Sequence, residues 1–144
     1  MKPAKPIHVG ILSTCSKPAD VDGNLDQIAS FARQASADGV DILLTPEMSA
    51  TGYGPYEDVL ALAEIAGQGP IFRRLAEIAK ETNVVITAGF VEQGPQPAIR
   101  YLSHYVVWPD GQFIAQRKNR ATLAEKPLCP GVELIPPDYV NAPP

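Results

Sequence analysis

The chain has 144 residues, a formal net charge of −4, 45% hydrophobic residues and 19% charged residues. These values are ordinary for one soluble globular domain, and the scattered Lys and Arg residues exclude a basic surface for nucleic acid. No apolar run approaches the about 20 residues that a membrane-spanning helix needs. Two cysteines are too few for a disulfide framework. We therefore expect a cytoplasmic protein without nucleic-acid or membrane partners.

The first half of the chain predicts alternating strands and helices. Residues 7–12 have the pattern of a short buried strand. A helix follows, with Asn24 as the predicted N-cap, Gln27 at the capping-box position and Gly39 at the C-cap. Residues 42–45 predict a second apolar strand. This order favours α/β layering with parallel strands.

The second half begins with another predicted helix and strand and then changes to an antiparallel hairpin. Pro70 suits the first turn of a helix, and residues 84–90 predict a third strand. Residues 101–108 and 112–117 flank a Pro-Asp-Gly turn, which predicts an antiparallel hairpin. We expect a loose start over residues 1–6, while the prolines of residues 132–144 predict an irregular tail.

Two charged residues stand at predicted strand ends. Glu47 follows the second strand, at the carboxyl end where α/β sheets gather functional groups, and a Gly-Tyr-Gly-Pro turn comes soon after it. Lys118 ends the hairpin. By position alone a solvated loop carboxylate and a terminal surface lysine are the simpler interpretations. A carboxylate in such a place also suits a general base.

Other reactive side chains give no further pattern. His8 alternates along the first strand as a structural or solvent-facing residue, and His104 is expected to face solvent on the hairpin. No Ser-His-Asp set, zinc site or phosphate-binding loop is indicated, so we expect no metal and no cofactor. Cys15 is interpreted as a small packed residue, and Cys129 as a half-buried loop thiol.

Two segments resemble the signatures of one enzyme family. Residues 39–53 (GVDILLTPEMSATGY) and 109–131 (PDGQFIAQRKNRATLAEKPLCPG) are similar to the first two motifs of the nitrilase, or carbon–nitrogen hydrolase, superfamily. The strand and Asn-led helix at residues 7–28 fit its opening. The resemblance implies a nitrilase-like α-β-β-α sandwich, of which residues 7–131 form a partial domain with a mixed sheet, helices on one face and an antiparallel hairpin.

The resemblance also implies a Glu-Lys-Cys mechanism. Glu47 would be the general base and Lys118 would stabilise the tetrahedral intermediate. Glu125 matches the auxiliary acidic residue that orients the lysine, and Tyr53 is a candidate wall of the substrate pocket. The substrate would be a small amide, carbamoyl compound or nitrile. The family nucleophile belongs to a later strand, so no residue of this chain is assigned to that role, and we expect a truncated domain.

Three functions remain open from the sequence. The first is a hydrolase of the amidase, carbamoylase or nitrilase type, including glutaminase-type ammonia supply as in NAD synthetases. The second is an inactive remnant that self-associates, and the third is binding without turnover. Because half of a sandwich leaves an apolar sheet face uncovered, we expect the chain to be oligomeric and inactive by itself.

Overall fold

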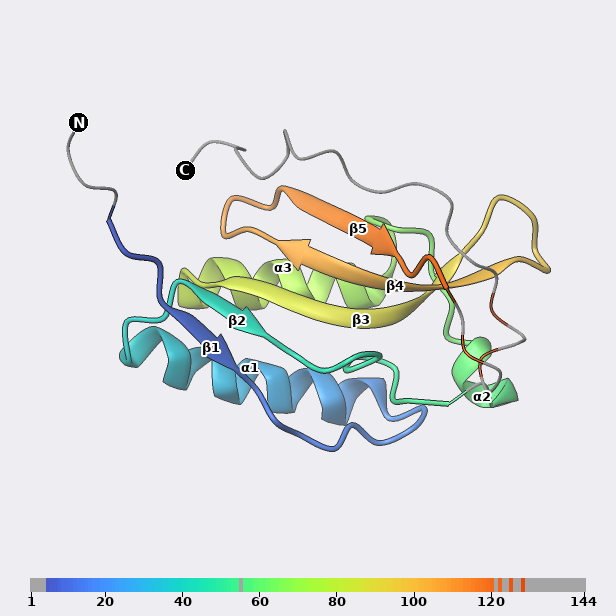
Figure 1. Ribbon diagram of the computed structural model, residues 1–144, viewed down its shortest axis with the longest axis horizontal. Helices are drawn as coiled ribbons and strands as arrows, with labels where there is room; N and C mark the ends of the chain where they lie inside the picture. Colours follow the sequence, from blue (N-terminus) through green and yellow to red (C-terminus); the bar gives the residue numbers. More distant parts are fainter. Residues whose placement is uncertain (1–4, 55, 121, 123–124, 126–127, 129–144) are drawn as a thin grey trace.

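The structure is a computed structural model that describes residues 5–54, 56–120, 122, 125 and 128. Its helices and strands follow the predicted order, with one short extra helix, α2 (Figure 1). The elements are β1 (Val9–Ile11), α1 (Val21–Ala37), β2 (Ile42–Leu44), α2 (Glu57–Leu60), α3 (Pro70–Thr82), β3 (Val85–Gln93), β4 (Arg100–Val107) and β5 (Phe113–Arg117).

The five strands form one mixed sheet in the order β1-β2-β3-β4-β5. Strands β1, β2 and β3 are parallel, whereas β4 and β5 add to β3 as an antiparallel meander. The parallel strands are linked by crossovers that contain α1 and α3, which is the α/β layering that the sequence predicts. The mixed sheet with an antiparallel hairpin is therefore confirmed.

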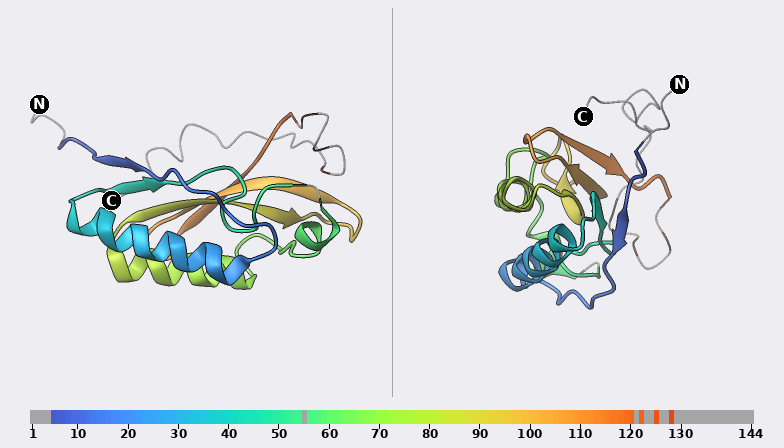
Figure 2. Two further views of the ribbon diagram at one scale, coloured as in Figure 1. Left: turned by 90° about the horizontal axis from the view of Figure 1, so that it is seen from below. Right: turned by 90° about the vertical axis from the view of Figure 1, so that its left-hand side faces the viewer.

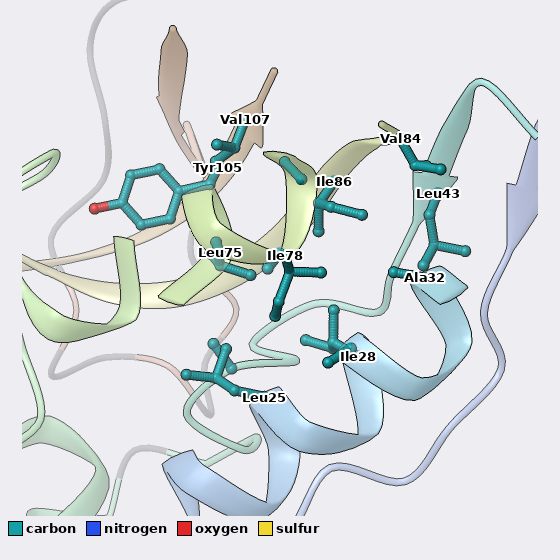
Figure 3. Close-up of a cluster of buried hydrophobic side chains, with 14 of the residues drawn as sticks. Leu25, Ile28, Ala32, Leu43, Leu75, Ile78, Val84, Ile86, Tyr105 and Val107 are labelled. Atoms are coloured by element: carbon teal, nitrogen blue, oxygen red, sulfur yellow. The ribbon is translucent and has the colours of Figure 1, made fainter. Parts of the chain in front are cut away.

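Helices α1 and α3 lie together on one face of the sheet (Figure 2). The core between the helices and the sheet combines aliphatic side chains from both layers, including Ile28, Leu43, Ile78 and Ile86 (Figure 3). Each such buried side chain contributes roughly 1.5–3 kcal/mol relative to exposure. Tyr105 closes one end of this core.

Helix α3 begins as its proline predicts, with Pro70 at the first helical position. Its first backbone N–H groups find a partner outside the helix, because the buried carboxylate of Glu64 accepts from Ile71 N at 2.9 Å and from Phe72 N at 3.0 Å. Tyr105 Oη also donates to this carboxylate, at 3.0 Å. Glu64 thus caps α3 from the preceding loop.

The predicted start of α1 at Asn24 is wrong. The helix begins one turn earlier, and Asp20 is the N-cap that accepts a hydrogen bond from Gly23 N at 3.2 Å. Asn24 is buried and uses its amide in tertiary contacts: it donates to the carbonyls of Lys17 and Ala50, at 2.9 and 3.2 Å. It therefore ties α1 to two loops and does not cap it.

The other sheet face is covered unevenly, and the prediction of a buried first strand is wrong. On β1, Val9 and Ile11 are 52% and 80% exposed, and Leu44 of β2 is 39% exposed. At the opposite end of this face, a second apolar cluster lies over β3 and β4; it consists of Met48, Val59, Val91, Leu102 and Leu128.

The predicted tail at residues 132–144, and all but two residues of the predicted loose start at 1–6, lie outside the described residues. Cys129 lies outside them as well. No helix among the described residues combines the length and the apolar character that crossing a bilayer requires.

Candidate functional site

Glu47 lies on the loop that leaves the carboxyl end of β2. Two backbone hydrogen bonds curl this loop into a turn, from Ser49 N to Pro46 O at 3.1 Å and from Gly52 N to Met48 O at 2.8 Å. Met48 has a positive φ of 52° and a buried side chain. The Glu47 side chain remains 42% exposed. The loop thus presents a carboxylate from a backbone that is fixed on both sides.

The loop over residues 45–52 is anchored to β3 at Gly89. Ala50 N donates to Gly89 O at 2.9 Å, and Gly89 N donates to Ser49 Oγ at 3.1 Å. A Cβ atom at Gly89 would lie 2.2 Å from Met48 N, so the two backbones approach too closely for any side chain. The position therefore requires glycine.

Two threonines reinforce this anchor. Thr45 N donates to Thr87 Oγ1 at 3.1 Å, and Thr45 Oγ1 donates to Thr87 O at 2.8 Å. The sequence motifs did not identify these supporting residues. An isolated glycine inside a strand is the one signal that indicates such a close backbone approach.

Lys118 approaches the same place from the end of β5. Its backbone N–H donates to Leu102 O at 2.8 Å. Its Nζ donates to Glu47 Oε1 at 2.7 Å and to Glu125 Oε1 at 2.9 Å. One ammonium group therefore joins two carboxylates that are 78 residues apart in sequence (125 − 47).

Glu125 is the buried member of this cluster, at 2% exposure. Besides Lys118, it accepts from Tyr53 Oη at 3.1 Å and from Thr122 N at 2.7 Å. The fold thus brings together Glu47, Tyr53, Lys118 and Glu125, the four residues that the sequence selects.

The hydrogen bonds hold the charges of the cluster in place. Hydrogen bonding to Glu47, with a further contribution from Glu125, raises the pKa of Lys118 against the opposing effect of burial. Burial also raises the pKa of Glu125, but the hydrogen bonds from Thr122, Lys118 and Tyr53 outweigh it and lower that pKa to about 2. At neutral pH Lys118 is therefore an ammonium and Glu125 a carboxylate.

His104 lies closer to the Glu47 loop than the sequence predicts. It pairs with Gly89 across β3 and β4 and is half-buried. Burial lowers its pKa, against the opposing charge of Glu47. The prediction that His104 faces solvent is wrong, because the loop that carries Glu47 crosses the sheet beside it. Cys15, in contrast, is exposed and not packed.

Within the described residues, no group of three or more His, Cys, Asp or Glu side chains is arranged to hold a metal ion. The cluster is instead suited to proton transfer and to the stabilisation of negative charge. An exposed carboxylate can accept a proton, while a protonated lysine beside it can face an oxyanion.

A sequence profile described as carbon–nitrogen hydrolase matches residues 8–139, which is most of the chain. The chain belongs to the carbon–nitrogen hydrolase family. A nitrilase of Pyrococcus abyssi is 30% identical over 107 residues, which is 73% of this chain and 40% of that protein. A probable nitrilase of Schizosaccharomyces pombe is 30% identical over 88 residues, or 60% of this chain and 32% of that protein.

Solved structures of the family share the fold. An amidase from Nesterenkonia sp. is 25% identical and has a TM-score of 0.75, and the match covers 88% of this chain and 49% of the amidase. One mutant of this amidase has been solved in complex with butyramide, and another with acrylamide added to its active-site cysteine. This chain thus spans about half of that amidase and less than half of the curated relatives that it matches.

Proposed function

We propose that this chain carries the general base and the charge-stabilising lysine of a carbon–nitrogen hydrolase site, with the nucleophilic cysteine supplied from outside the chain. The observation that carries the proposal is the Lys118 ammonium, which donates to both Glu47 and Glu125. The substrate class is a small amide, carbamoyl compound or nitrile. An amide is favoured, because the amidase that shares the fold has been solved with butyramide.

In the proposed reaction, the cysteine thiol gives its proton to Glu47 while its sulfur attacks the amide carbon. The oxyanion that forms faces the Lys118 ammonium. Glu47 returns the proton to the nitrogen as the C–N bond breaks, so that ammonia leaves and a thioester remains. Glu47 then takes a proton from water, whose oxygen attacks the thioester. As the C–S bond breaks, Glu47 gives that proton to the departing sulfur, so that the acid and the thiol are released.

Glu125 and Tyr53 have supporting roles in this proposal. The buried Glu125 carboxylate stays ionised and directs the Lys118 ammonium, and the raised pKa of Lys118 keeps that group a cation and not a base. Tyr53 is 47% exposed and donates to Glu125, so its ring is free to line the substrate side of the cluster.

The proposal is tested by ammonia release from acetamide, butyramide and glutamine, measured on the longest protein that the gene encodes. Glu47→Gln and Lys118→Ala are expected to lower kcat/KM by at least about 100-fold, since each removes a group that acts in the transition state. Glu57→Gln and Lys80→Ala are matched controls on exposed surfaces of α2 and α3 and are expected to retain activity.

Hydrolysis that persists in Glu47→Gln would show that the cluster is not the catalytic site. Glutamine as the preferred substrate would select the glutaminase-type alternative. If the reading frame closes at residue 144 and the chain releases no ammonia, the inactive remnant is the better description.

One observation favours self-association. Val9, Ile11 and Leu44 place exposed apolar side chains on neighbouring strands of one sheet face, and β1 leaves an unpaired edge among the described strands. Such a surface favours contact with a second copy of the chain. We therefore propose that the isolated chain is a homo-oligomer.

A further inference from the structure

A second ion pair lies directly next to Lys118 in sequence. Arg117, the last residue of β5, donates to Glu92 Oε1 from Nε at 3.0 Å and from Nη2 at 2.6 Å. The Glu92 side chain is 5% exposed, whereas that of Arg117 is 37% exposed. A buried carboxylate that receives two donors from one guanidinium fixes the direction of that side chain.

Three neighbouring strands build this pair. Ser103 Oγ of β4 donates to Glu92 Oε2 at 2.5 Å, so both carboxylate oxygens are engaged. The Arg117 guanidinium also lies 4.0 Å from the centroid of the Tyr101 ring. The register accounts for the arrangement, because Glu92 lies opposite Tyr101 and Ser103 lies opposite Arg117. All four side chains therefore occupy one face of the sheet.

The face that they occupy is the helix side, shared with Phe90 and Tyr105 of the core. Since successive side chains of a strand point to opposite faces, Lys118 leaves β5 toward the other face. That is the face on which the Glu47 loop crosses Gly89. Arg117 is thus anchored on the helix side of the sheet, while Lys118 reaches the cluster on the opposite face.

This anchor matters because β5 lies at an edge of the described sheet and has five residues. The end of a short edge strand frays readily, since it is paired on one side only. Movement at Arg117 would move the Lys118 backbone and lengthen the two hydrogen bonds from its Nζ. The placement of Lys118 therefore depends on what holds Arg117.

We propose that Glu92 and Ser103 are positioning residues. They hold Arg117 on the helix side of the sheet and thereby keep the Lys118 ammonium between Glu47 and Glu125. This inference rests on the proposed role of Lys118, but it concerns the geometry of that lysine and not turnover. It assigns a function to an ion pair with a buried carboxylate that lies outside the cluster itself.

The test is the acetylation rate of Lys118 in the 144-residue chain at pH 8.5, measured by mass spectrometry with N-hydroxysuccinimidyl acetate. Exposed Lys80 of the same molecule is the internal reference. Only a neutral amine is acylated, so the hydrogen-bonded Lys118 reacts slowly in the native chain. Glu92→Gln is expected to raise the Lys118/Lys80 rate ratio about 3- to 10-fold, because a Lys118 that loses its hydrogen bonds has a lower pKa and a larger fraction of neutral amine.

Glu64→Gln is the matched control. Glu64 is likewise a buried carboxylate with three hydrogen-bond donors, but those donors are on α3 and Tyr105 and not on β5. Its replacement is expected to lower the melting temperature by an amount similar to Glu92→Gln while the rate ratio stays at the native value. Ser103→Ala, which removes one hydrogen bond, is a milder second variant and is expected to raise the ratio by a smaller factor.

An unchanged ratio in both Glu92→Gln and Ser103→Ala would overturn the inference. Equal increases in Glu92→Gln and Glu64→Gln would also overturn it, because they would reflect general loosening. If Glu92→Gln does not fold, Ser103→Ala decides the question by the same criterion. The assay needs no turnover, so its result is independent of whether Glu47→Gln abolishes ammonia release.

Discussion

At the scale of single residues, Glu125 carries the largest electrostatic effect in the cluster. Its carboxylate is buried and accepts from Lys118, Tyr53 and Thr122. These donors lower its pKa from 4.5 to about 2 against the effect of burial. A group whose pKa is lower in the folded chain stabilises that chain above its unfolded pKa, and this stabilisation is lost as the pH falls through the folded pKa.

We predict that Glu125→Gln flattens the acid side of the stability profile. The native chain should lose up to about 3 kcal/mol of unfolding free energy between pH 5 and about pH 2, because the unfolded chain takes up this proton first. The variant lacks that contribution. Urea unfolding at several pH values measures the slope, with Glu57→Gln as the control for an exposed carboxylate. Equal slopes in Glu125→Gln and the native chain would contradict the assignment.

Sequence reasoning identified the charged residues of the cluster but not their supports. Glu47, Lys118 and Glu125 stand out because they occur in recognisable motifs. Asn24 was interpreted as a helix cap because its type and spacing fit one. Its amide instead forms hydrogen bonds with the backbone of Lys17 and Ala50. Local spacing does not encode such tertiary contacts.

At the scale of elements, the Glu47 loop is shaped by its contact with β3. Besides the hydrogen bonds of its own turn, the loop has a backbone that lies against Gly89 with almost no space between them. Strand β3 extends to Gln93, beyond the predicted end at Phe90, since polar Glu92 is buried and paired. The predicted strand therefore ended too early.

We predict that Gly89→Ala destabilises the chain by roughly 2–4 kcal/mol, because the new Cβ must displace the backbone at Met48. Gly10→Ala is the matched control on β1, where a Cβ would meet only side-chain atoms, at 3.2 Å or more. Chemical denaturation of both variants compares the two costs. Similar small losses in both would show that the loop does not depend on its contact with β3.

At the scale of the whole molecule, the two faces of the sheet differ. Helices α1 and α3 cover one face, as the family resemblance implies (Figure 2). The pattern of residues 7–12 did not indicate that β1 is exposed, because an apolar strand has the same composition whether or not another layer covers it. The family resemblance did predict an uncovered apolar sheet face.

We predict that the exposed part of this face mediates association of the isolated chain. Ile11→Lys should shift the chain toward monomer, because a lysine ammonium is costly to bury in an apolar contact. Ile65→Lys replaces another exposed isoleucine, outside the sheet, and should leave the mass unchanged. Light scattering after size-exclusion chromatography gives the mass. A monomeric native chain would contradict the prediction.

The central claim is that the chain holds the Glu–Lys part of a hydrolase site without its nucleophile. The most direct measurement is ammonia release from butyramide by the purified 144-residue chain, compared with its Glu47→Gln variant. The account predicts equal, background rates for the two. Release by the native chain that disappears in both Glu47→Gln and Cys129→Ser would contradict it, because the chain would then contain its own nucleophile.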